Sequence, residues 1–146
     1  MAEQQIKDAT SGFTQSWTSG DINKALSFFA DDATWIAPNG TFKGRAEIER
    51  YLTWVIKIVR DYKITETGIG TVIKGDVAIA EHILSGTIDG RKFESPAVCI
   101  DEFKNGKIVN SRTYFDRLAQ SQQVAKGMFA KSGVNAVIKA VQKGLS

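Results

Sequence analysis

The sequence predicts a single α+β domain in which an antiparallel sheet follows a group of helices. Three observations support this prediction. Apolar residues recur at helical spacing in the first third of the chain, the stretch 62–118 alternates with a period of two, and glycine-containing turns divide that stretch into four strands. A chain of 146 residues is long enough for one domain with a buried core and short for two. Helices that precede consecutive hairpins indicate a sheet that curls over the helices.

Three helices are expected before the long strands. The first is predicted over about 3–18 and ends at Gly20, where a helix-terminating glycine is typical. Asp21 is expected to cap a short second helix that ends before Asp31. The third is predicted between Gly44 and Arg60 from its recurring apolar positions. The apolar stripe of the first helix consists of Ile6, Ala9, Phe13 and Trp17.

The strands and the end of the chain complete the predicted domain. A short strand over 34–37 precedes a turn at 38–40. The four longer strands are predicted at about 62–73, 76–88, 91–104 and 107–118. Gly68-Ile69-Gly70 lacks the third glycine of a dinucleotide fingerprint and predicts a bulge instead. A last helix is expected around Val134 and Val141, so residues 119–146 form a C-terminal helical extension of the domain over 1–118.

Two stretches of the sequence carry a family resemblance. They run from Gly20-Asp21-Ile22 through Phe28–Trp35 and Pro38-Asn39-Gly40 to Lys43-Gly44-Arg45, and from Phe103–Ile108 to Arg112–Asp116. In this order, over about residues 5–118, they resemble the nuclear transport factor 2-like superfamily, and within it the SnoaL-like polyketide cyclases and limonene-epoxide hydrolases. The resemblance implies a cone, a curved sheet wrapped around the N-terminal helices with a pocket inside. It does not decide the reaction, because such a fold serves both enzymes and binding modules.

The resemblance also assigns catalytic positions. The base, the oxyanion-hole tyrosine and the protonated acid of ketosteroid isomerases align with Ala37, Phe13 and Cys99, which excludes that chemistry. Of the groups used by limonene-epoxide hydrolases, only Asp116 remains. The other positions are occupied by Trp35, Ala37, Ala80 and His82. The acid/base aspartate of the SnoaL-like cyclases, on the last strand, is retained as Asp116, so this sub-group is favoured.

Strand alternation predicts which side chains enter the pocket. Even-numbered residues of the last strand share one face, among them Arg112, Tyr114 and Asp116. The resemblance points this face into the cone, together with His82 and with the small side chains of Ser95 and Cys99. Aromatic residues are expected opposite them: Phe13, Trp17, Trp35 and Trp54. Such a lining favours a hydrophobic small molecule as ligand, although aromatic residues at helical spacing are also typical of plain core.

The predicted function is proton transfer on a hydrophobic carbonyl or epoxide substrate, without a cofactor. Burial in an apolar pocket would raise the pKa of Asp116 towards neutrality, whereas a pair with Arg112 would keep it ionised. His82 is the expected complementary acid or base. Tyr114 and Arg112 would orient a carbonyl or enolate oxygen. The alternative is a non-catalytic ligand-binding module or assembly domain of the same fold, in which Asp116 and Arg112 pair structurally.

Composition bounds the remaining expectations. A single cysteine and a single histidine leave no cluster for zinc or haem, so no metal is predicted. The sequence has neither an apolar run long enough to span a membrane nor a secretory signal, which predicts a cytoplasmic protein without membrane insertion.

Two surface features predict how the chain meets partners. Residues 117–146 carry five basic and no acidic side chains, and such a tail can indicate binding to nucleic acid or to an anionic membrane. The lysines are widely spaced, without interleaved arginine and aromatic residues, which favours solvated helix faces instead. Apolar residues on the outward face of the sheet predict a homodimer through that face. These are Ile79, Ile83, Val98, Ile100, Val109 and Phe115. The C-terminal helix is expected to cover part of this face or to close the mouth of the cone.

Overall fold

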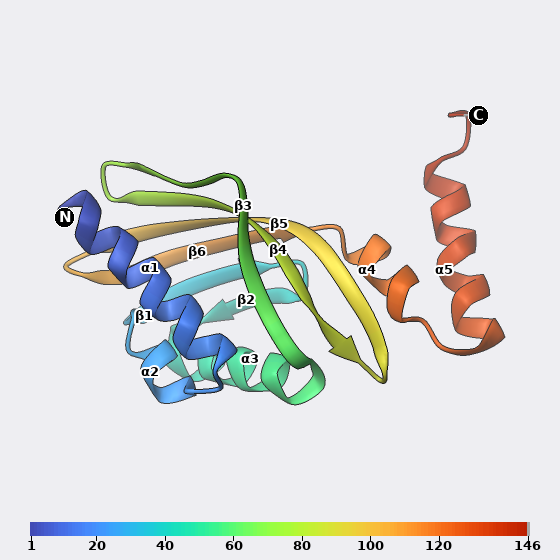
Figure 1. Ribbon diagram of the computed structural model, residues 1–146, viewed down its shortest axis with the longest axis horizontal. Helices are drawn as coiled ribbons and strands as arrows, with labels where there is room; N and C mark the ends of the chain where they lie inside the picture. Colours follow the sequence, from blue (N-terminus) through green and yellow to red (C-terminus); the bar gives the residue numbers. More distant parts are fainter. Residues whose placement is uncertain (146) are drawn as a thin grey trace.

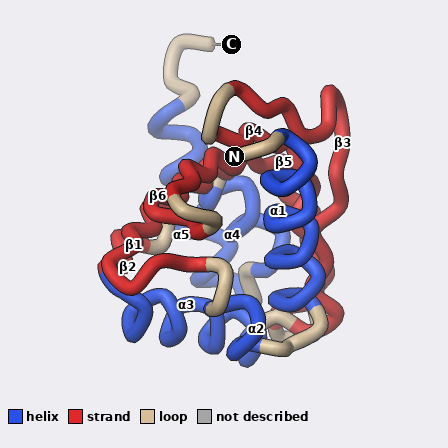
Figure 2. The backbone as a smooth tube through the Cα atoms, turned by 90° about the vertical axis from the view of Figure 1, so that its left-hand side faces the viewer, coloured by secondary structure: helices blue, strands red, loops and turns tan. Residues whose placement is uncertain are grey.

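A computed structural model, which describes residues 1–145, confirms the α+β class and the curved sheet (Figure 1). In chain order the elements are α1 (Glu3–Thr18), α2 (Ile22–Leu26), β1 (Phe29–Ala37), β2 (Gly40–Lys43), α3 (Gly44–Ile58), β3 (Arg60–Lys74), β4 (Val77–Ile88), β5 (Arg91–Lys104), β6 (Lys107–Phe115), α4 (Arg117–Val124) and α5 (Gly127–Val141). The sheet curves around α1 and α3, which fill its concave side (Figure 2). This arrangement is the predicted cone.

The six strands form one sheet in the order β2-β1-β6-β5-β4-β3. The meander from β3 to β6 is antiparallel throughout, as the glycine turns predicted. β1, however, pairs with β6 in parallel, and β2 is a strand that the sequence did not predict. The sheet is therefore mixed rather than purely antiparallel, since β1 joins it from a distant part of the chain.

The helix boundaries follow local signals. α1 matches the prediction and ends just before Gly20, whose φ of +83° lies in the left-handed region that favours glycine. Asp21 caps α2 by accepting a hydrogen bond from the amide of Lys24 at 3.0 Å. α2 ends at Leu26 rather than close to Asp31, because the chain from Phe29 onward joins β1.

Aromatic side chains dominate the core where α1, β1 and α3 meet. The rings of Trp17 and Trp35 lie 5.3 Å apart and tilted edge to face, and Tyr51 lies 5.1 Å from Trp35. The indole of Trp17 donates to the carbonyl of Leu52 at 3.2 Å, which ties α1 to α3. Each such buried side chain contributes about 1.5–3 kcal/mol, so this cluster holds the helices firmly inside the sheet.

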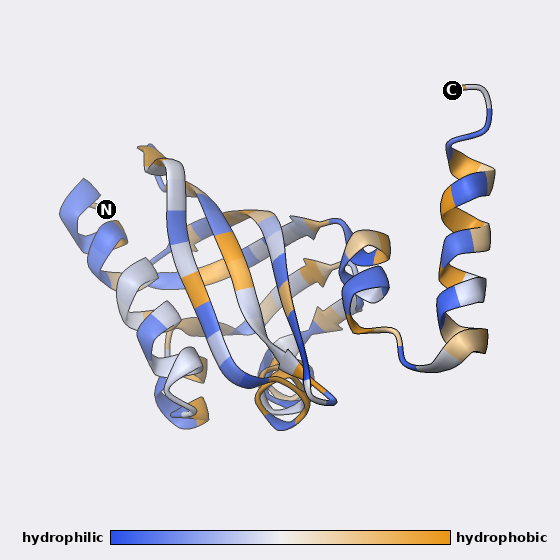
Figure 3. Cartoon of the chain, turned by 45° about the vertical axis from the view of Figure 1, so that its right-hand side comes forward, coloured by the Kyte–Doolittle hydropathy of each residue, from blue (hydrophilic) through white to orange (hydrophobic). Residues whose placement is uncertain are grey.

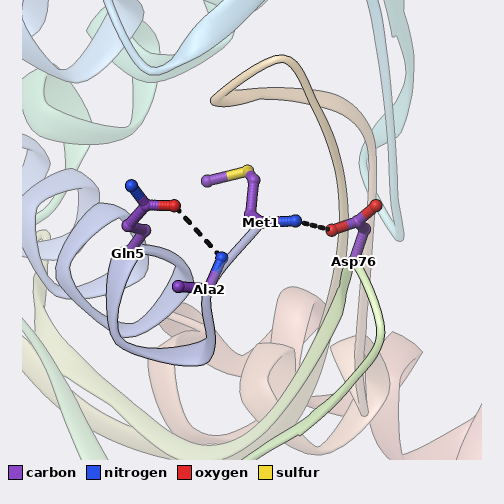
Figure 4. Close-up of polar contacts among 4 residues, drawn as sticks. All are labelled: Met1, Ala2, Gln5 and Asp76. Carbon is purple, nitrogen blue, oxygen red and sulfur yellow. Dashed lines mark hydrogen bonds and ion pairs between the residues drawn. The ribbon is translucent and has the colours of Figure 1, made fainter.

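The start of α1 is fixed at two points (Figure 4). The ammonium group of Met1 lies 2.6 Å from a carboxylate oxygen of Asp76, in the β3–β4 turn. The amide of Ala2 donates to the side chain of Gln5 at 3.1 Å, as in a capping box. These contacts hold the beginning of the first helix beside the far end of the sheet.

The predicted bulge at Gly68-Ile69-Gly70 is confirmed. Glu66 pairs with His82 and Thr71 with Ala80, so β3 advances five positions while β4 advances two. Both glycines have φ near +60 to +70°, which permits the local bend.

The C-terminal extension consists of α4 and α5. α4 lies against β5, where the side chain of Gln123 exchanges two hydrogen bonds of 2.9 Å with the backbone of Glu94. α5 projects away from the body of the molecule (Figure 1), and no residue of it is buried. No helix among residues 1–145 has the length and apolar character needed to cross a membrane.

Candidate functional site

An internal cavity of about 70 Å³ lies between the sheet and the helices. Its walls are mostly apolar and aromatic, with contributions from α1, β1, α3 and the strands of the meander. The aromatic lining includes Phe13, Trp17, Trp35, Tyr51, Trp54 and Tyr62. This volume holds a few water molecules or a small organic group.

The predicted aromatic wall is found. Phe13, Trp17 and Trp35 are buried and line the cavity. Trp54 also lines it but is 43% exposed, which marks the side where the cavity approaches solvent. The chain's three tryptophans thus all contribute to this one wall.

The inward faces of β4 and β5 are those that alternation predicted. On β4 the buried positions include His82, and on β5 they include Ser95. His82 and Cys99 line the cavity, whereas Ser95 is buried on the same face without reaching it. A period of two without interruption is enough to assign these faces.

The inward face of β6 is the opposite of the predicted one, because the strand contains a bulge. Phe103 pairs with Ile108 and Glu102 with Asn110, so Val109 is an extra residue on β6. One inserted residue turns every later side chain to the other face. The residues that face the cavity are therefore Ser111, Thr113 and Phe115.

Because of the bulge, three residues predicted to face the cavity lie outside it: Arg112, Tyr114 and Asp116. Phe115, predicted on the outer face, lines the cavity instead. The guanidinium of Arg112 lies 2.6 Å from a carboxylate oxygen of Glu102 on the outer face, and not beside Asp116. Tyr114 is 53% exposed, also on the outer face. Asp116 lies beyond the end of β6, where its carboxylate accepts a hydrogen bond from the amide of Ala119 at 2.9 Å and caps α4. None of these three residues lines the cavity.

A different carboxyl group, that of Asp101, lines the cavity. Asp101 lies on β5 opposite Ser111, is 5% exposed, and its Oδ1 atom has no hydrogen-bond partner. Burial raises the pKa of Asp101 from 3.8 to about 6, while the Ser111 hydroxyl and the charge of Arg112 act in the opposite direction. The cavity therefore holds an acid that titrates near neutral pH.

Sequence reasoning missed Asp101 although its signal was present. The predicted inward series on β5 ran through Ser95 and ended at Cys99, and the next position of the same alternation is Asp101. The resemblance had assigned the acid of ketosteroid isomerases to Cys99. The structure places a carboxyl group one inward position further along the same strand.

His82 lies in a different part of the cavity wall. It is 8% exposed and its Nδ1 atom has no hydrogen-bond partner. Burial lowers the pKa of His82, and the charge of Glu66, its partner in register on β3, opposes this shift. His82 is four positions along β4 from Ala78, the residue opposite Asp101, which separates the two backbones by about 13 Å along the sheet. The acid and the imidazole face the cavity from separate places and do not form a direct pair.

Other polar groups of the wall are occupied or held neutral. The indole of Trp35 donates to the Thr113 hydroxyl at 3.0 Å, and the Cys99 sulfur lies 3.7 Å from the same hydroxyl. Burial raises the pKa of Cys99 to about 12, so its thiol is a poor nucleophile. Burial also raises the pKa of Tyr51 and Tyr62, which therefore remain hydrogen-bond donors. Asp101 and His82 are thus the cavity's candidates for moving a proton.

Within residues 1–145, no three side chains of His, Cys, Asp or Glu lie close enough together to hold a metal ion.

Comparisons with known proteins agree with this architecture. Residues 11–111 match the family of SnoaL-like domains. No curated protein matches the sequence. A protein with a ketosteroid isomerase-like fold from Catenulispora acidiphila, solved in complex with trimethylamine, is similar in structure with a TM-score of 0.75 and 20% identity, covering 82% of this chain and 94% of its own.

Two further solved structures share the fold. TerC, co-crystallized with polyporic acid, has a TM-score of 0.74 and 19% identity, with 84% of this chain and 99% of its own covered. TsrD from Streptomyces laurentii has a TM-score of 0.73 and 18% identity, with 84% and 96% covered.

Proposed function

This chain belongs to the SnoaL-like domain family, and on that basis we propose that it is a small-molecule enzyme in which Asp101 acts as the acid/base of the cavity. One observation carries the proposal. In the part of the chain that the structure describes, the buried side-chain atoms without a hydrogen-bond partner are Thr10 Oγ1, His82 Nδ1 and Asp101 Oδ1, and all three residues line this cavity. Unsatisfied buried polar groups are costly, so a cavity that collects them is suited to a ligand with polar groups of its own.

The proposed reaction is proton transfer on a hydrophobic carbonyl or epoxide substrate. With a pKa of about 6, the Asp101 carboxylate can accept a proton from a carbon beside a carbonyl, or from water, and can return it at neutral pH. The aromatic wall binds the apolar part of the substrate and excludes bulk water. His82, neutral because burial lowers its pKa, supplies a hydrogen-bonding group at a second place on the wall. The transfer needs no cofactor.

The matched aspartates of this chain allow a direct test. We expect the wild-type protein to exchange the α-protons of a cyclic ketone for deuterium in D2O, followed by NMR across a panel of hydrophobic ketones. Asp101→Asn should lower the exchange rate by about a hundredfold or more, the usual scale for removing a general base. Asp116→Asn is the control, because asparagine caps a helix as well as aspartate does and Asp116 lies outside the cavity.

Equal exchange rates for the two variants would remove Asp101 from the mechanism. Near-UV circular dichroism of both variants establishes that the comparison is made between folded proteins.

A second candidate function is binding of a small organic cation without catalysis. An ionised carboxylate in a cavity lined by aromatic rings is a suitable site for an alkylammonium group, through charge and cation–π attraction. The structural neighbour solved with trimethylamine supports this candidate. Calorimetry with trimethylamine separates the two functions: a cation-binding protein gains affinity as the pH rises through 6, loses it in Asp101→Asn, and exchanges no ketone protons.

We also propose that the protein forms a homodimer and is located in the cytoplasm. Ile79 and Val98 are partly exposed on the outer face of the sheet, which supports a homodimer through that face. A cytoplasmic location, where such a dimer would act, stays a prediction.

A further inference from the structure

The helix α5 carries an apolar stripe that the rest of the chain does not bury. It stands apart from the body of the molecule (Figure 1), and its turns carry both hydrophobic and hydrophilic residues (Figure 3). From this arrangement we propose that α5 binds the surface of an anionic lipid bilayer.

The first observation is the apolar stripe. Val134, Val137, Ile138 and Val141 follow the spacing i, i+3, i+4, i+7 and so lie on one side of α5. Val137 is 50% exposed and Val141 is 68% exposed. A short helix with an uncovered apolar side is marginal in water, which implies that something else covers it.

The second observation is the positive charge of this end of the chain. Lys139 lies across α5 from the valines, Lys131 lies at the edge of the apolar stripe, three residues before Val134, and Lys143 follows the end of the helix. Lys126 precedes the helix, and no acidic residue follows Asp116 in the sequence. Lysines beside an apolar stripe, without acids, are typical of helices that lie in the interface of anionic membranes.

The body of the same chain leaves α5 uncovered. Its polar contact with the rest of the molecule is a 3.5 Å hydrogen bond from Gln122 to Asn135. The helix covers neither the outer face of the sheet nor the wall of the cavity, the two roles that the sequence suggested. The lysines are solvated, as predicted, but so is the apolar side, which a globular helix would bury.

Charge favours a lipid surface over a second copy of α5. Pairing two copies through this helix would bring together two segments that each carry five positive charges from residue 117 onward. A bilayer with acidic headgroups accepts the valine stripe among its acyl chains and the lysines at its phosphates. With 15 residues, α5 is about 22 Å long, shorter than the roughly 30 Å of a bilayer core, so it lies along the surface.

Vesicle flotation with the full chain tests this proposal. We expect binding to vesicles of phosphatidylcholine with about 30% phosphatidylserine, little binding to pure phosphatidylcholine, and loss of binding at about 1 M salt. Removing three charges by Lys131→Gln, Lys139→Gln and Lys143→Gln should weaken binding about a hundredfold, at the usual contribution of one lysine near an anionic surface. The matched control removes three exposed lysines of the body by Lys57→Gln, Lys63→Gln and Lys104→Gln and should bind as the wild type does.

Val137→Asp, which disrupts the apolar stripe, should also abolish flotation. Because Val137 is exposed, this substitution leaves the core intact, and an unchanged near-UV spectrum verifies it. The proposal fails if neutral and anionic vesicles bind equally, if neither binds, or if the two triple variants behave alike. It also fails if Val137→Asp converts a dimer to a monomer in light scattering while flotation is unchanged, since a second copy then covers the stripe.

Discussion

At the scale of single residues, the cavity's two titratable groups have opposite effects on stability. The folded protein raises the pKa of Asp101 to about 6 and lowers that of His82. Between pH 3.8 and 6 the folded chain therefore keeps a proton on Asp101 that the unfolded chain has lost. The stability that Asp101 contributes is complete below pH 3.8 and is lost as the pH rises through 6. For His82 the contribution is present above its ordinary value of 6.5 and is lost as the pH falls.

This linkage gives a measurable prediction for Asp101→Asn. Between pH 4 and pH 7.5, the free energy of unfolding of this variant should rise relative to the wild type by up to about 3 kcal/mol, because the cost of ionising a buried acid is removed. Urea unfolding at several pH values measures the difference. His82→Gln should change the curve in the opposite sense, with the gain on the acidic side. Parallel curves for Asp101→Asn and wild type would show that Asp101 is not buried as an acid of raised pKa.

At the scale of elements, alternation predicted the site correctly only where strands are uninterrupted. The faces of β4 and β5 followed from their apolar positions, but β6 did not. Its sequence carries apolar or small residues on both parities, as Ile108 and Val109 show, and no glycine marks the bulge. The bulge becomes visible only when β6 is paired with β5. Resemblance could not reveal it either, since Asp116 has the expected position in the sequence while its side chain caps α4.

The capping role of Asp116 predicts a local effect. Asp116→Ala should destabilise α4 by about 1 kcal/mol, because the amide of Ala119 loses its acceptor. Hydrogen exchange of the amides of α4 reports this change, and Asp116→Asn should leave their protection nearly as in the wild type. Any activity that depends on the cavity should survive both substitutions. A large loss of activity in Asp116→Asn would contradict this prediction and show that Asp116 contributes to the activity of the cavity.

At the scale of the whole molecule, the order of the central strands, the class of the fold and the aromatic cavity were all predictable. The parallel pairing of β1 with β6 was not, because it joins segments that are distant in the sequence and no turn fixes their register. The sequence also could not predict that α5 stands apart from the domain, because an apolar stripe indicates that a helix is covered but not which surface covers it.

The outer face of the sheet predicts a dimer. Light scattering of the wild type should give twice the mass of one chain. Val98→Glu should give the mass of a monomer, because it places a second carboxylate opposite Glu81, and the two like charges would be buried in the interface without a partner. Ile69→Glu, at the exposed bulge of β3, is the control and should leave the mass unchanged. A wild-type protein that is monomeric at high concentration would contradict the prediction.

Because all three tryptophans line the cavity, the intrinsic fluorescence of the protein should report on ligand binding there. Tryptophan emission therefore arises entirely from residues that would contact a molecule in the cavity. A ligand that absorbs at the wavelength of tryptophan emission, such as a quinone, would quench the fluorescence. A ligand that does not absorb there would shift the emission wavelength by displacing water from the indole rings. Unlabelled protein can therefore be screened against a chemical library in a cuvette, before any reaction product is known.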